Sequence, residues 1–282
     1  MNVQWYPGHM AKTKRLIQEN LKLVDMVIEL VDARLPLSSR NPDIDHIVGQ
    51  KPRLLLMNKS DLADPSINIL WETWFKDHHQ SVLLIDSVTG KGFHQIEQEA
   101  RKLLKEKIER DRSKGMVNRS ITAMVVGIPN VGKSSFINKI SGRASAKTGD
   151  KPGVTRGKQW VRMKNGLELL DTPGILWPKF EDVEVGKKLA FTGAIKDEII
   201  DIEELTCNLL EFLRDHYPQN LMQRYQLDHV IGLKGFELLD LIAKKRGCIV
   251  AGGELDTFRA ASIILDEFRA AKIGKISLER PE

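Results

Sequence analysis

The segment ITAMVVGIPNVGKSSFINKIS, residues 121–141, constrains the fold of this chain more than any other feature. Its apolar start predicts a buried strand, a glycine-containing loop follows at residues 127–134, and a helical pattern follows the loop. The loop matches G-x-x-x-x-G-K-[ST] in full, and in this context the pattern is typical of a phosphate-binding loop. We therefore expect an α/β domain built on a parallel sheet.

Six short runs rich in Val, Ile and Leu are predicted to be strands. They lie at residues 25–33, 52–58, 81–87, 121–127, 158–163 and 167–174. Several are apolar on both faces, as in a parallel sheet that helices cover on both sides. Helical patterns at 70–79 and 92–112 separate the earlier strands. The predicted fold class is therefore α/β, with a doubly wound, mostly parallel sheet in residues 1–178.

A second, smaller domain is expected at residues 179–282, where only helical spacing is found. The apolar positions of this pattern are Ile202, Leu205, Leu209, Leu210, Leu213, Phe236, Leu238, Leu239, Leu241, Ile242, Phe258, Ala261, Ile264, Leu265 and Phe268. Pro218 and the pair Gly252 and Gly253 separate the segments. This domain is predicted to be all-helical.

Composition narrows the classes of protein that fit. The 282 residues are 41% apolar, enough for a sizeable core, and the net charge of +5 favours a polyanionic partner. Cys207 and Cys248 lie far apart in no metal-binding pattern, so reduced thiols are expected. No apolar run is long enough to cross a bilayer, and we expect a cytoplasmic monomer that binds neither membrane nor DNA.

The phosphate-binding loop assigns roles to its residues. Gly127 and Gly132 allow backbone N–H groups to surround phosphates, Lys133 is expected to reach the β and γ phosphates, and Ser134 is expected to bind Mg²⁺. The remaining contacts are expected from Asn130, Val131 and Ser135. This loop predicts a nucleoside triphosphate as the ligand.

The motif DTPG, residues 171–174, ends a predicted strand beyond the phosphate loop. Asp171 is expected to hold the Mg²⁺ shell, and the Gly174 N–H to meet the γ-phosphate. Thr155, in the loop sequence KPGVTRG, is expected to close over Mg²⁺ when the γ-phosphate is present. These residues predict a segment whose conformation depends on the nucleotide.

The tetrad NKSD, residues 58–61, follows a predicted strand, and ligands bind at the carboxyl ends of strands in such sheets. The N1–H and N2–H₂ groups of guanine suit the Asp61 carboxylate, and adenine lacks this pair of donors. Asn58 is expected near N7 and the Lys59 stem along the base. Ser87 and Val88, after the next strand, are expected to offer a backbone N–H to guanine O6. The bound nucleotides are therefore predicted to be GTP and GDP.

The base-reading tetrad precedes the phosphate loop, which reverses the usual order in guanine-nucleotide-binding domains. Cutting such a domain after the strand that ends in DTPG, and joining its old termini, produces this order. The charged helix at 93–110 and the segment RSKGMVNRS at 112–120 form the predicted join. Domain termini often lie close together, so such permutation is physically tolerated.

With these motifs, the chain resembles the circularly permuted YlqF/YawG-type GTPases. The resemblance rests on NKSD, IDSVTG, GIPNVGKSS, PGVT and DTPG in permuted order, with WYPGHMAKT at the start and DARLPLSSRNP at 32–42. It implies hydrolysis of GTP coupled to late assembly of the large ribosomal subunit. It also implies a helical C-terminal domain that contacts ribosomal RNA.

One position departs from many GTPases, because Ile175 follows DTPG where a glutamine often orients water. A low basal rate is therefore expected, with Ras-like values on the order of 10⁻⁴ s⁻¹ as the scale. We hypothesise that His9 orients the attacking water, the alternative being that it anchors the terminus beside neighbouring aromatic residues. Asn130 resembles a K⁺-binding residue of cation-dependent relatives, the alternative being a solvated loop side chain.

Clusters of basic residues are candidates for RNA contact, although any one such cluster is more often a solvated surface. They are Lys12, Lys14 and Arg15; Lys147, Lys151, Arg156 and Lys158; and Lys244, Lys245 and Arg246. The predicted function is a GTPase that binds the large-subunit precursor and its rRNA with GTP and leaves after ribosome-stimulated hydrolysis. The alternative is a GTP-gated RNA-binding protein in which hydrolysis is incidental. A small-molecule kinase is disfavoured by NKSD.

Overall fold

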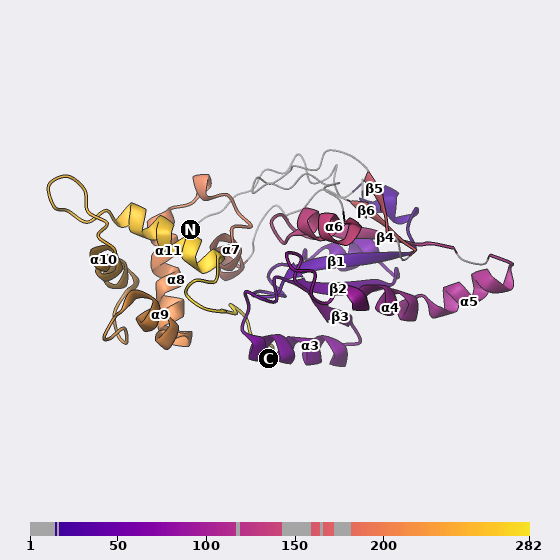
Figure 1. Ribbon diagram of the computed structural model, residues 1–282, viewed down its shortest axis with the longest axis horizontal. Coiled ribbons are helices and arrows are strands. Elements are labelled where there is room, and N and C mark those ends of the chain that lie inside the picture. The colour runs from indigo at the N-terminus through magenta and orange to yellow at the C-terminus, as the bar shows by residue number, and fades with distance from the viewer. Residues whose placement is uncertain (1–14, 16, 117–118, 143–158, 164–165, 172–181) are drawn as a thin grey trace. The chain divides into compact units, whose positions relative to one another are not determined.

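The computed structural model describes residues 15, 17–116, 119–142, 159–163, 166–171 and 182–282 (Figure 1). The chain divides into two compact units. The helical unit is Asp182–Ile276, and the sheet unit contains the described residues before Asp182 together with Ser277–Glu282. The sequence analysis places residues 277–282 in the helical domain. They join the sheet unit instead, because their hydrogen-bonding partners lie there.

The sheet unit is built on six strands, at the positions that the apolar runs predict (Figure 1). They are β1 Met26–Asp32, β2 Arg53–Asn58, β3 Ser81–Leu84, β4 Ile121–Val126, β5 Gln159–Arg162 and β6 Leu167–Asp171. Their spatial order is β3-β2-β1-β4-β6-β5, and only β5 runs antiparallel to its neighbour. The predicted mostly parallel α/β fold is confirmed.

Strand β1 lies between β2 and β4, and this arrangement positions the candidate site. Asp32 of β1 is level with Asn58 of β2, and Glu29 is level with Val126 of β4. All seven residues of β1 are buried, so both faces of the sheet are covered. Because parallel strands end at one edge, the loops after β2 and β4 open on either side of the β1 terminus.

The helices of the sheet unit are α2 Ile44–Val48, α3 Pro65–Asp77, α4 Phe93–Leu103, α5 Lys105–Ser113 and α6 Lys133–Ser141. Helix α3 starts earlier than its apolar pattern predicts, because Asp64 accepts the Ser66 N–H at 2.9 Å and Pro65 occupies the first turn. The helix predicted at 92–112 is divided at Leu104 into α4 and α5. Trp71 and Phe75 of α3 pack on Leu55, Met57 and other residues of one sheet face.

The helical unit contains α7 Val183–Phe191, the 3₁₀ turn η1 Asp197–Ile199, α8 Ile202–His216, α9 Pro218–Tyr225, α10 Gly235–Lys245 and α11 Thr257–Arg269. Helices α10 and α11 both pack on α8. A Cβ added to Gly235 would lie 2.4 Å from the Cys207 carbonyl oxygen, so a glycine is required where α10 approaches α8. Among the described residues of this unit, the sole extended pairing is the bridge between Ile249 and Leu255.

Three apolar positions of the predicted helical pattern do not enter the core of the helical unit. Phe236, Leu241 and Phe258 are 57%, 39% and 60% exposed. Both cysteines carry free thiols, with Cys248 buried and Cys207 partly exposed. Across the residues that the structure describes, no helix combines the length and apolar character needed to cross a membrane.

Candidate nucleotide-binding site

The phosphate-binding loop connects β4 to α6, and two of its glycines are required by close contacts. A Cβ at Gly127 would lie 2.6 Å from the Leu30 carbonyl oxygen, so the start of the loop lies close against β1. At Gly132, φ is 97° and a Cβ would lie 2.4 Å from Asn58 Nδ2. Any side chain at Gly132 would therefore meet both backbone strain and a steric clash.

Lys133 begins helix α6, and its ammonium group folds back over the loop. Nζ donates to the carbonyl oxygens of Gly127 at 3.0 Å and Ile128 at 2.7 Å, and the residue is buried. Ser134 and Ser135 occupy the first turn of the same helix and are partly buried. The positive charge and the N-terminus of α6 thus meet at the loop, which favours an anion there.

Asn58, the last residue of β2, joins three loops through one buried side chain. Its Nδ2 donates to the Val131 carbonyl oxygen at 2.7 Å, which holds the phosphate loop. Its Oδ1 accepts the Ser87 N–H at 3.0 Å and the Ser87 hydroxyl at 2.8 Å. The base-reading loop, the phosphate loop and the loop after β3 are therefore held in one arrangement without ligand contacts.

Lys59 provides a second link between the base-reading loop and the phosphate loop. Its Nζ donates to the Asn130 carbonyl oxygen at 2.6 Å and lies 3.1 Å from Asp32 Oδ2. Asp32 also accepts two hydrogen bonds from the Arg34 guanidinium, at 2.9 and 2.7 Å. Burial raises the pKa of Asp32, but the charges of Arg34 and Lys59 outweigh it and hold that pKa well below its usual range.

The pKa of Lys59 itself is lowered, mainly by burial and also by repulsion from Arg34, while Asp32 opposes the shift. The Lys59 amine is held in place between the Asp32 carboxylate and the Asn130 carbonyl oxygen. This fixes the direction of the four-carbon stem. The sequence analysis assigns that stem to the face of the base, and its anchored end is compatible with the assignment.

The other predicted base contacts lie at the same edge of the sheet. Asp61 is exposed, in the loop that follows β2. Ser87 and Val88 follow β3, and both backbone N–H groups already have acceptors: Asn58 Oδ1 at 3.0 Å for Ser87 and Asp86 Oδ1 at 2.7 Å for Val88. If either N–H also contacted guanine O6, that N–H would be divided between O6 and the acceptor it already has.

Comparison with known proteins decides the family. A family model described as 50S ribosome-binding GTPase matches residues 122–236, starting within β4 and leaving the tetrad at 58–61 outside the match. Ribosome biogenesis GTPase A of Priestia megaterium is 51% identical over 282 residues, covering 100% of this chain and 98% of the relative. The chain belongs to the ribosome biogenesis GTPase A family. The predicted resemblance to YlqF/YawG-type GTPases is thereby confirmed.

Two solved structures resemble this GTPase along nearly its whole length. A GDP-bound structure of YlqF is 27% identical, with a TM-score of 0.67, covering 95% of this chain and 99% of that one. A GNP-bound YlqF from Thermotoga maritima is 28% identical, with a TM-score of 0.65, covering 96% and 99%. The protein is an enzyme that binds guanine nucleotide and hydrolyses GTP, as predicted.

Several predicted site residues of this GTPase lie outside the described residues, namely His9, Thr155 and Gly174. Asp171 ends β6 and is level with Val125 of β4, which brings its backbone to the edge where the phosphate loop begins. In the described part of the chain, no group of three His, Cys, Asp or Glu residues is arranged to hold a metal. The Ser134 hydroxyl, beside the phosphate loop, suits Mg²⁺ that is shared with nucleotide phosphates.

Two residues that organise the site were given no role by sequence reasoning. Asp32 and Arg34 lie within DARLPLSSRNP, where the sequence shows only a charged pair after a buried strand. Their burial is the informative feature, since each is 2% exposed. A signal was available, because an acidic residue at the carboxyl end of a central strand is costly to bury without a cationic partner.

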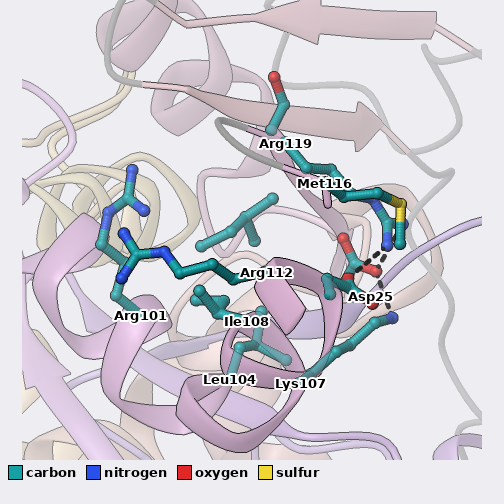
Figure 2. A pocket seen from close by; sticks show the side chains of 11 residues that line it. Asp25, Arg101, Leu104, Lys107, Ile108, Arg112, Met116 and Arg119 are labelled. Atoms are coloured by element: carbon teal, nitrogen blue, oxygen red, sulfur yellow. Dashed lines mark hydrogen bonds and ion pairs between the residues drawn. The ribbon is translucent and has the colours of Figure 1, made fainter. Parts of the chain in front are cut away.

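A cavity of about 100 Å³ lies away from the nucleotide loops, around Asp25 at the amino end of the sheet (Figure 2). The Asp25 carboxylate accepts from Lys107, from Arg119 at 3.0 Å and from the Thr122 N–H at 2.9 Å. Burial raises its pKa, but the hydrogen bonds from Lys107 and Thr122 lower it below the ordinary value. These contacts attach Lys107 and Arg119, both within the predicted permutation join, to Asp25, which directly precedes β1 and bonds to Thr122 of β4, so we assign the cluster a structural role.

Proposed function

We propose that this GTPase assists assembly of the large ribosomal subunit in the cytoplasm. In this proposal it binds the precursor particle and its rRNA with GTP, and it leaves after hydrolysis that the particle stimulates. The direct link between base-reading and phosphate loops, through Lys59 and Asn58, carries the nucleotide part of the proposal. The name of the relatives and the description of the matching family model support the ribosomal part.

The proposed reading of guanine depends on Asp61. Its carboxylate, exposed beside the end of β2, would accept the N1–H and N2–H₂ donors of guanine. Asn58 would act mainly by holding the loops, since its side-chain amide already has three partners. Lys59 would lie along the base, and a backbone N–H of Ser87 or Val88 would reach O6. GTP would then be preferred over ATP, because a bound adenine would cover the Asp61 carboxylate without offering it the two donors, and such an unsatisfied acceptor is costly.

The proposed hydrolytic machinery surrounds the phosphate loop. The backbone of residues 130–135 would surround the phosphates, and Lys133 would leave its two carbonyl acceptors to reach the β and γ phosphates. Bound Mg²⁺ would neutralise phosphate charge, held by Ser134, Thr155 and Asp171. The Gly174 N–H would meet the γ-phosphate. His9 would orient the attacking water, since Ile175 has no hydrogen-bonding group.

The K⁺ contact at Asn130 stays a prediction. Asn130 has φ of 61°, and its carbonyl oxygen accepts from Lys59. This holds the residue within the phosphate loop, where a monovalent cation would offset charge that develops in the transition state. Equal hydrolysis rates in K⁺ and Na⁺ would contradict it.

Contact with RNA is proposed for the helical unit. Phe236 and Phe258 are both exposed, and both begin helices that meet the same part of α8: Gly235 approaches Cys207, and Thr257 donates to Glu203. Exposed aromatic rings can stack on unpaired bases, and exposed basic residues can contact phosphates. Lys244 and Lys245 are exposed, whereas Arg246 bonds to Glu267 at 2.7 Å. The two lysines are therefore better candidates than Arg246.

The decisive experiment measures single-turnover GTP hydrolysis with and without purified large subunits. Strong stimulation is expected for the wild type. Lys133→Ala should remove activity, whereas Lys76→Ala, a surface lysine on α3 that pairs with Glu72, should behave as the wild type. His9→Ala should retain GTP affinity and lose the stimulation.

Two outcomes would contradict the proposal. Binding of large subunits in the GTP state without stimulated turnover would favour a GTP-gated RNA-binding protein. Stimulation by small subunits to the same extent would remove the assignment to the large subunit. Steep salt dependence of particle binding, weakened in Lys244→Ala and Lys245→Ala, is expected if the helical unit contacts phosphates.

A further inference from the structure

The end of the chain returns from the helical unit to the sheet unit. Ser277, Leu278 and Glu279, which we call the strap, follow directly on Ile276, the last residue of the helical unit. Ser277 and Leu278 are 2% and 4% exposed. Tails are usually ordered only when specific contacts hold them, so the partners of the strap are informative.

The strap first holds the loop that follows β1. The Leu278 N–H donates to the Arg34 carbonyl oxygen at 2.7 Å. The Glu279 carboxylate accepts the backbone N–H groups of Leu37 at 2.9 Å and Ser38 at 3.2 Å, and also the Ser38 hydroxyl. Hydrogen bonds to a carboxylate are the stronger kind, so this loop is held firmly.

The strap also holds the start of α3. The Asp64 N–H donates to Ser277 Oγ at 3.1 Å, and the buried Trp71 ring N–H donates to the Glu279 carbonyl oxygen at 3.3 Å. Asp64 follows the tetrad at 58–61 by three residues. The strap therefore joins the two segments between which the base-reading loop is held.

A chain of contacts runs from the strap to the base-reading loop. Arg34, whose carbonyl oxygen meets the strap, holds Asp32 through two hydrogen bonds. Asp32 in turn lies 3.1 Å from Lys59 Nζ, and the Ala33 N–H donates to the Asn58 carbonyl oxygen at 2.8 Å. Displacement of the strap would thus release the loop that positions both the first and second residues of the tetrad.

We propose that the strap is a positioning element for guanine recognition, with Glu279 as its main anchor. It acts on the affinity for the base and leaves the hydrolysis of bound GTP unchanged. This inference rests on the proposed guanine contact of residues 58–61. Because the strap continues from the helical unit, a ligand of that unit gains a covalent route to the base-reading loop, and nucleotide would by linkage favour the docked strap.

The test measures the affinity of the full-length protein for GDP, together with competition by inorganic tripolyphosphate, which occupies the phosphate loop and has no base. Glu279→Ala should raise the Kd for GDP about tenfold, the scale of one charge-assisted hydrogen bond. The tripolyphosphate constant should change less than the GDP constant, because Lys133 still holds the phosphate loop, and single-turnover hydrolysis of saturating GTP should stay unchanged. Glu279→Gln, which keeps one acceptor oxygen, should show a smaller loss.

Matched variants separate positioning from general damage. Glu282→Gln removes a carboxylate from the same tail at an exposed position and should bind GDP as the wild type. Ser277→Ala provides a milder change if Glu279→Ala fails to fold, with a loss of about threefold expected from one neutral hydrogen bond. Unchanged GDP affinity in both strap variants would overturn the proposal, as would equal weakening of GDP and tripolyphosphate.

One further variant tests the guanine site itself. Asp61→Asn should shift preference from GDP to xanthosine diphosphate, because the amide offers a donor to the xanthine 2-oxygen. If Asp61→Asn leaves guanine preference intact, the proposed guanine contact is wrong and the strap loses its target. If the preference shifts while the strap variants bind GDP normally, the guanine contact stands and the strap proposal alone fails.

Discussion

Replacing Asn58 with alanine should cost the sheet unit about 3 kcal/mol of unfolding free energy. The side chain is 1% exposed and makes three hydrogen bonds, to Val131, to the Ser87 N–H and to the Ser87 hydroxyl. The hydroxyl can rotate to a new partner, whereas the Val131 carbonyl and the Ser87 N–H would stay in place. Two buried groups without partners cost about 1–3 kcal/mol each, and part of this is recovered by relaxation.

The measurement is urea denaturation followed by tryptophan fluorescence. The five tryptophans are at positions 5, 71, 74, 160 and 177, and all precede Asp182. Because residues 182–276 of the helical unit contain no tryptophan, the fluorescence reports on the sheet unit. Asn68→Ala is the matched control, because that buried amide donates one hydrogen bond, to the Ser60 carbonyl at 3.0 Å. It should lose about 1 kcal/mol.

The reasoning would be refuted if Asn58→Ala lost less than about 1 kcal/mol of unfolding free energy, or lost the same amount as Asn68→Ala. Two unsatisfied buried groups should destabilise the protein by more than that. GDP affinity gives a second readout. Asn58→Ala should weaken GDP binding more than Asn68→Ala does, since Asn58 also holds the phosphate loop.

Three further predictions concern other contacts. Gly132→Ala should abolish nucleotide binding, whereas Gly142→Ala, also at positive φ but with open space around its Cβ position, should cost about 1 kcal/mol of stability and leave nucleotide affinity intact. Folding lowers the pKa of Asp32 below its usual value of about 4, so its ion pairs stabilise the protein above about pH 4 and are lost as pH falls further. Asp32→Asn should therefore be most destabilising at neutral pH, and the difference from wild type should shrink below pH 4 in urea titrations. Glu267→Ala should cost the helical unit about 2 kcal/mol in calorimetry, because three partners lose one buried carboxylate, whereas Asp197→Asn, in an exposed pair, should cost under about 0.5 kcal/mol.

The strands were predictable because a strand that is buried on both faces appears in the sequence as a short run of apolar residues. The runs at 25–33, 52–58 and 121–127 contain β1, β2 and β4, since each is mostly apolar and its apolar residues fall on both faces of the strand. Helices were less predictable. Helices α7 and α9 were missed because they have only nine and eight residues, so the helical spacing of apolar positions hardly repeats within them. The division at Leu104 has no proline or glycine to indicate it.

The candidate site was predictable to the extent that its chemistry is written in short motifs. Residues 127–134 and 58–61 could be named because each motif combines residue types that phosphate and guanine require. The supporting contacts could not be named. Asp32 meets Lys59, and Glu279 meets Ser38, only because of the fold, and no local pattern marks a partner 241 residues away.

The sequence by itself determined the motifs, their permuted order and the positions of the strands, because each depends on neighbouring residues. Only the tertiary structure decided that β1 lies between β2 and β4, which brings Asn58 to Val131, 73 residues along the chain. It also decided that residues 277–279 return to the sheet unit. The physical reason is that strand order and tail docking depend on the burial and hydrogen bonding of distant groups, which local preferences do not encode.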